Sequence, residues 1–61
     1  MMENKKSIIA KIAKRKRVNP KNITNLYADA CNYFFSYTNI NGKFVRHDMY
    51  SFNEIGEKPV F

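Results

Sequence analysis

The dipeptide Asn19-Pro20 constrains the fold of this chain more than any other feature, because it marks a boundary between two elements. Proline lacks the backbone N–H that a helix interior uses, but the first position of a helix leaves that group unbonded in any case. Asparagine is favoured immediately before a helix, where its side chain accepts a hydrogen bond from the backbone. The pair therefore predicts that one element ends near Arg17 and that a second begins at Pro20 as a helix.

The segment before this boundary has the pattern of a basic amphipathic helix. Apolar residues recur at helical spacing along one face, at Ile8, Ile9, Ile12 and Ala13. Lysine and arginine side chains lie opposite them, and Asn4 stands where a cap is expected. These features predict a helix over about residues 4–17, within a basic N-terminal segment 3–17.

The segment after the boundary also has helical periodicity. Its apolar stripe consists of Ile23, Leu26, Tyr27, Ala30, Phe34 and Tyr37, and its polar stripe of Asn22, Asn25, Asp29, Asn32 and Ser36. We therefore predict a second helix over about residues 20–37. A competing pattern favours a hairpin in which residues 33–40 pair with 43–50 across Asn41-Gly42, which would end the helix near Asn32. The continuous polar stripe favours the helix.

The residues after Gly42 carry weaker patterns. A short β-hairpin over about residues 43–55 is the first prediction, and a third helix over 45–55 is the alternative. The predicted fold class is thus a small α+β protein with two N-terminal helices, with an all-α three-helix protein as the alternative. A chain of 61 residues provides one domain, which we assign to residues 1–61.

Positive charge is concentrated in the first third of the chain. Residues 1–21 hold eight cations and one carboxylate, a net charge of +7, whereas residues 22–61 hold three cations and four carboxylates, a net charge of −1. The two values add to the formal charge of +6. Such asymmetry favours binding to a polyanion or to an acidic protein surface.

Residues 12–27, IAKRKRVNPKNITNLY, resemble the helix-turn-helix segment of the lactose-repressor-like and Cro/repressor-like DNA-binding families. The matching positions are a small residue in the first helix, an apolar residue after the turn, the capping pair, and two apolar residues of the second helix. They are occupied here by Ala13, Val18, Asn19-Pro20, Ile23 and Leu26. The resemblance implies that the second helix lies in a major groove of DNA. Arg17 stands where these families usually have glycine.

Site residues follow from this resemblance by position. Lys21, Asn22 and Asn25 would face the bases, and a hairpin after the second helix would act as a wing that brings Lys43 and Arg46 near DNA. The cations expected along the phosphate backbone are Lys11, Lys14, Arg15, Lys16 and Arg17. We therefore expect a small basic nucleic-acid-binding protein, a transcription regulator for which DNA is favoured over RNA.

The aromatic content supports other functions. Nine Tyr and Phe side chains exceed what one small core requires, and surplus aromatics favour a protein interface or a base-stacking surface. One alternative is a phage-type or mobile-element protein that binds and inhibits a host protein, such as a nucleic-acid enzyme. Another is an RNA-binding protein. A homodimer could form through the surplus aromatics, taken to be Phe35, Phe44, Tyr50 and Phe52.

The sequence contains no constellation typical of catalysis. Cys31 and His47 are the single Cys and His, and no pattern brings them together as a nucleophile and base or as metal ligands. Two glycines are too few for a phosphate-binding loop. We expect no enzymatic activity, metal or cofactor. With one cysteine and no apolar run near the roughly 18 residues of a membrane span, we expect a cytoplasmic protein of a bacterial or phage-infected cell.

Overall fold

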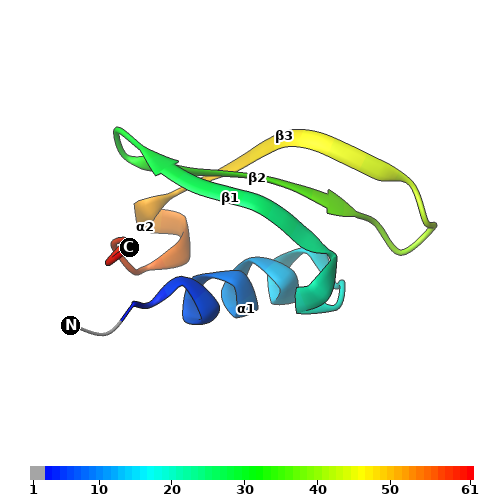
Figure 1. Ribbon diagram of the computed structural model, residues 1–61, viewed down its shortest axis with the longest axis horizontal. Coiled ribbons are helices and arrows are strands. Elements are labelled where there is room, and N and C mark those ends of the chain that lie inside the picture. Colours follow the sequence, from blue (N-terminus) through cyan, green and yellow to red (C-terminus); the bar gives the residue numbers. More distant parts are fainter. Residues whose placement is uncertain (1–2) are drawn as a thin grey trace.

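The computed structural model describes residues 3–61, and the chain runs from a helix through a three-stranded sheet to a second, short helix (Figure 1). The elements are helix α1 (Lys5–Lys16), the 3-10 helix η1 (Pro20–Asn22), strands β1 (Ile23–Asp29), β2 (Asn32–Thr38) and β3 (Phe44–Ser51), and helix α2 (Phe52–Ile55). The strands form one antiparallel sheet in the order β1-β2-β3. Both α-helices lie on the same face of this α+β fold, which leaves the other face without a covering helix (Figure 1).

The predicted first helix is confirmed as α1, and it ends in a tight reversal at Arg17. This residue has a left-handed backbone, with φ 59° and ψ 42°. The N–H of Val18 donates to the carbonyl of Ala13 at 3.0 Å, and the N–H of Arg17 donates to that of Lys14 at 3.3 Å. These are the two hydrogen bonds of a Schellman motif, in which glycine usually occupies the left-handed position. Arg17 takes the conformation of a glycine at this turn.

Asn4 does not cap α1 as the sequence predicted. Its side chain makes no hydrogen bond to the first turn. Its Nδ2 atom donates to the Glu57 carboxylate and to the carbonyl of Lys58, both at 2.7 Å, and its Oδ1 atom accepts from the N–H of Val60 at 2.7 Å. Asn4 therefore ties the C-terminal segment to the beginning of α1.

The predicted helix over residues 20–37 is wrong beyond its first turn. Asn19 does cap a helix, because its Oδ1 atom accepts from the N–H of Lys21 at 3.0 Å. That helix is η1, which has only three residues and leads directly into β1. The second long helix is replaced by two strands.

A bulge in β1 explains why the apolar spacing was misleading. Asn25 has a left-handed backbone with φ 55°, and the register shifts between Thr24 and Tyr27. An extra residue in a strand lets side chains three positions apart point to the same face. Ile23 and Leu26 are therefore both buried against α1, although they are spaced like residues of a helix.

The C-terminal half corrects two further predictions. Residues 43–55 do not form a hairpin of their own, because they contain a single strand, β3, followed by α2. The all-α alternative is not supported. The competing hairpin across Asn41-Gly42 is closer to the observed structure, since β2 pairs with β3. In the loop between them, Asn39 Oδ1 accepts from two backbone N–H groups. Residues 33–40 and 43–50 thus approximate the observed hairpin.

The core lies between α1 and the inner face of the sheet. It consists of Ile8, Ile12, Ala13, Ile23, Leu26, Tyr33, Phe35 and Ile55. Helix α1 supplies only aliphatic side chains of moderate size, so the sheet provides the aromatic bulk. Phe35 is 1% exposed, and Tyr50 and Phe52 pack against the core. Of the four aromatics that we predicted as surplus, only Phe44 is largely exposed.

Candidate nucleic-acid interface

Six of the eight cations in residues 1–21 form two groups, with Lys5 and Lys6 apart from both at the start of α1, and the first group holds the fold together. Lys11 forms an ion pair with Glu57 at 2.7 Å. Arg15 donates to the backbone carbonyl of Glu54, and its guanidinium lies over the ring of Tyr50, 5.5 Å from the centroid. These contacts join α1 to α2 and to the chain that follows it. Lys11 and Arg15, predicted to line phosphates, have structural partners.

Lys16 belongs to the same structural group and faces the sheet. Its Nζ atom lies 2.6 Å from a carboxylate oxygen of Asp48. The same atom lies over two tyrosine rings, 4.9 Å from the centroid of Tyr50 and 5.1 Å from that of Tyr37. Burial acts to lower the pKa of Lys16, but hydrogen bonds to Asp48 and Tyr50 outweigh it and raise the pKa. Lys16 links α1 to β3 rather than to a ligand.

Besides Asp48, the side chains of α1 bind a second carboxylate, that of Glu57. Hydrogen bonds from Lys11, Asn4 and Ser7 lower its pKa. The backbone carbonyl of the same residue accepts from the buried Tyr33 hydroxyl at 2.6 Å, and burial together with the nearby carboxylate raises the pKa of Tyr33. Glu57 therefore joins α1, β2 and the C-terminal segment.

The second group of cations, which we call the basic corner, consists of Lys14, Arg17 and Lys21. All three are exposed, at the end of α1, in the left-handed turn and in η1. Within residues 3–61 none of them forms a salt bridge or lies over an aromatic ring. The corner thus presents three cations to solvent around one turn of the chain.

The three residues predicted to face DNA bases are not carried by a helix. Lys21 and Asn22 lie in η1, and Asn25 lies exposed in the bulge of β1. The geometry that the helix-turn-helix resemblance implies requires an α-helix from Pro20 onward, where the structure has β1. The side chains at this corner can contact a backbone of phosphates without that helix.

The predicted wing residues lie toward the same end of the molecule as the basic corner. Ile23, which follows η1, pairs with Tyr37, and Tyr37 pairs with Val45. Since neighbouring strands are about 4.8 Å apart, this row brings the start of β1 within roughly 10 Å of the segment that carries Lys43 and Arg46. The β2–β3 loop and the end of α1 point to the same side in Figure 1.

Sequence reasoning missed the uncovered face of the sheet. Tyr27, Phe34 and Met49 form one row across the three strands, since Tyr27 pairs with Phe34 and Phe34 with Met49. We had placed Tyr27 and Phe34 in the apolar stripe of a helix. The alternation of β2, in which Tyr33 and Phe35 are buried and Phe34 is not, was the available signal.

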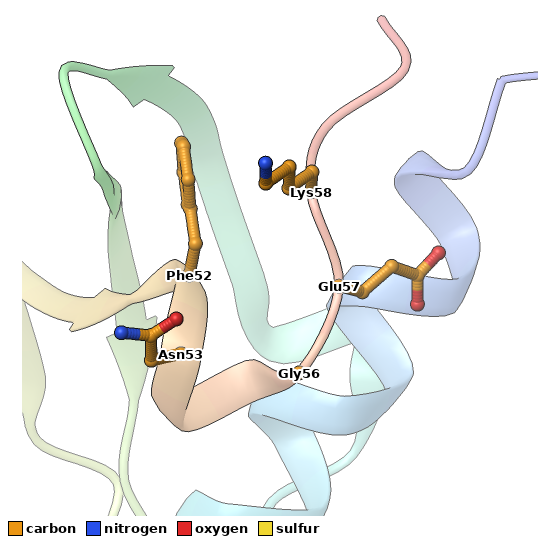
Figure 2. A pocket seen from close by; sticks show the side chains of 5 residues that line it. All are labelled: Phe52, Asn53, Gly56, Glu57 and Lys58. Carbon is orange, nitrogen blue, oxygen red and sulfur yellow. The ribbon is translucent and has the colours of Figure 1, made fainter.

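A small pocket lies between α2 and the C-terminal segment (Figure 2). Its volume is about 230 Å³, and it is lined by Phe52, Asn53, Gly56, Glu57 and Lys58. Figure 2 shows the Glu57 carboxylate directed toward α1, where it is already hydrogen-bonded. Of the two ionisable side chains in the lining, Glu57 and Lys58, the first is therefore held by α1.

Cys31 and His47 are not brought together. Cys31 lies in the loop before the Asn32–Ser51 pair, whereas His47 lies in the bulge between the Phe35–Asp48 and Tyr37–Val45 pairs, at the level of Ser36. Four residues of β2 separate these positions, about 13 Å of strand. In the described part of the chain, no three His, Cys, Asp or Glu side chains are grouped as metal ligands, and no helix is long and apolar enough to cross a membrane.

Comparison of the chain with protein-family models, with curated proteins and with solved structures found no match.

Proposed function

We propose that this protein binds nucleic acid and that the basic corner contacts the phosphate backbone. The observation that carries the proposal is the unequal use of the N-terminal cations. Lys11 and Lys16 are matched to Glu57 and Asp48, whereas the basic corner has no carboxylate partner within residues 3–61. A polyanion that neutralises such a cluster releases its own condensed counterions, which favours binding.

The backbone of Arg17 supports this proposal. A left-handed conformation costs a non-glycine residue about 1–2 kcal/mol, and the turn would form more readily with glycine. An exposed arginine in this position contributes charge to the corner at the expense of stability. Strained residues of this kind are often found at functional sites.

The proposed ligand is nucleic acid in general, with no preference between DNA and RNA. The sequence-based preference for DNA relied on a recognition helix from Pro20, and η1 and β1 occupy that segment. Phosphate contacts by themselves carry no sequence information and act on DNA and RNA alike. We also propose a role in regulation, which follows from the charge distribution and the resemblance in the sequence. The proposed location is the cytoplasm of a bacterial or phage-infected cell.

The test is a salt titration of binding to labelled oligonucleotides. The logarithm of the affinity should fall linearly with the logarithm of salt concentration, with a slope of about 0.7 to 0.9 for each phosphate neutralised. Lys14→Ala and Lys21→Ala should each reduce that slope by roughly one such step. Lys58→Ala is the matched control, because it removes the same charge from the C-terminal segment. Absence of binding at low salt, or equal effects of all three variants, would reject the proposal.

A further inference from the structure

The face of the sheet opposite the helices carries a group of aromatic and apolar side chains, of which Tyr27, Phe44 and Met49 are exposed and Phe34 is half-buried. We call it the open sheet face and define it by Tyr27, Phe34, Phe44, Arg46 and Met49. Tyr27, Phe34 and Met49 form a row across all three strands, and Phe44 lies further along β3, paired with Thr38. Tyr27 and Met49 are 52% and 50% exposed. No helix of residues 3–61 covers this face (Figure 1).

Two rings of this face, those of Tyr27 and Phe34, are stacked on each other. The centroids of Tyr27 and Phe34 are 5.2 Å apart, with 20° between the ring planes. The guanidinium of Arg46 lies over the ring of Phe44, 5.7 Å from its centroid. Aromatic rings and guanidinium groups on a protein surface are the features that engage unpaired bases, whose flat faces pack on either group.

We propose that the open sheet face stacks the bases of single-stranded nucleic acid. This inference rests on the proposed function and names its substrate class. In a duplex, bases are already stacked on one another and their faces are inaccessible, so only unpaired bases can use Tyr27 and Phe34 in this way. Sheet aromatics of known RNA-binding modules stack roughly two or three bases, which suits the size of this row.

Cations are gathered at one end of the face, whereas the exposed Asp29, two residues after Tyr27 in β1, lies at the other end. Arg46 lies on the face itself, and Lys43 lies in the adjoining β2–β3 loop. The same end of the molecule carries the basic corner. The nearest carboxylate of β3, Asp48, pairs with Phe35 in register and is held by Lys16 on the helix side. A strand with its bases on Tyr27 and Phe34 would therefore run toward cations.

A second copy of the chain is a poorer occupant. Three strands of about seven residues make a face of roughly 14 by 23 Å, or about 330 Å². A standard interface buries about 800 Å² on each partner. The open sheet face alone is thus too small for a stable dimer, whereas a few bases need less area.

The experiment compares a mixed-sequence single strand with the matching duplex, using fluorescence anisotropy. Tyr27→Thr and Phe34→Thr remove one ring each and retain a residue that favours strands. Each should weaken single-strand binding about fivefold to a hundredfold, as expected for the loss of one stacked base, with no change in the salt slope. Tyr27→Phe should bind normally. Ile40→Thr, in the β2–β3 loop, is the matched control because it removes an exposed apolar side chain away from the rings.

The outcomes separate this inference from the proposed function. Binding with a normal salt slope that is equal for duplex and single strand, and unchanged in both ring variants, would overturn the stacking inference and leave phosphate binding in place. Loss of all binding at low salt in the unmodified protein would overturn both. Sedimentation that finds a dimer dissociated by Tyr27→Thr would identify the face as an interface between copies and also overturn the inference.

Discussion

Replacement of Arg17 by glycine should make the protein more stable and should, at the same time, weaken its binding to nucleic acid. The backbone at this position is left-handed, with φ 59°, which costs an L-residue about 1–2 kcal/mol. Glycine removes that cost but adds roughly 0.5–1 kcal/mol of chain entropy to the unfolded state. The net gain is about 0.5–1 kcal/mol, because no hydrogen bond, ion pair or ring contact of the Arg17 side chain offsets it within residues 3–61.

The assay is thermal and urea unfolding followed by circular dichroism. For a domain of this size a gain of 1 kcal/mol raises Tm by about 4–8 °C, so Arg17→Gly should raise it by roughly 2–8 °C. Arg17→Ala is the matched control, since it removes the same charge but keeps a Cβ atom in the left-handed region. It should leave Tm close to that of the unmodified protein.

Binding separates the two contributions of Arg17. Both variants remove one cation from the basic corner, so both should reduce the salt slope by the same amount, about 0.7 to 0.9. If Arg17→Gly were no more stable than Arg17→Ala, the turn after α1 would not have the conformation described here. If both variants retained the full slope, Arg17 would not contact phosphate.

Three further predictions concern stability. Tyr33→Phe should cost about 1–2 kcal/mol in urea unfolding, because the carbonyl of Glu57 loses a buried hydroxyl donor at 2.6 Å, whereas Tyr37→Phe should cost little. Since the pKa of Glu57 is lowered in the folded protein, its contribution to stability is present above its ordinary pKa of 4.5 and is lost as pH falls through the folded value. Glu57→Gln should flatten the acid limb of the pH–stability curve, and an unchanged limb would contradict the assignment. Ala30→Gly should raise stability by about 0.5–1 kcal/mol, because Ala30 has φ 54° in the two-residue loop between β1 and β2, and a decrease would show that this loop has another form.

The first helix and the boundary at Asn19 could be predicted from the sequence because their signals are local. The apolar spacing of Ile8, Ile9, Ile12 and Ala13 fits one face of a helix and not one face of a strand, and the cap of Asn19 depends on a residue two positions away. The strand content could not be predicted in the same way, because the apolar residues from Ile23 to Tyr37 fit a helical stripe. Two left-handed residues, at Asn25 and Ala30, convert that stripe into two strands with a bulge and a tight turn.

The candidate site was predictable only as a concentration of charge. Lysine and arginine in the segment 14–17 look alike in sequence, yet Lys16 is turned toward Asp48 and Arg17 toward solvent. Which cation is structural depends on carboxylates more than 30 positions away, and sequence spacing carries no information about such partners. The open sheet face was missed for a similar reason, since its row of side chains exists only once the strands are in register.

Bulges in the two outer strands lie between the two ends of the open sheet face. Asn25 in β1 and His47 in β3 are left-handed, and the register shifts they cause lie opposite neighbouring residues of β2, Phe35 and Ser36. A bulge bends its strand and increases the local twist. The bulges of the two outer strands lie at about the same level of the sheet, where Phe35 of β2 is buried in the core. Along the strands, Tyr27 and Phe34 lie on one side of the bulges, and Lys43 and Phe44 lie on the other. Both bulges also interrupt the exposed edges of β1 and β3, which disfavours pairing with another chain.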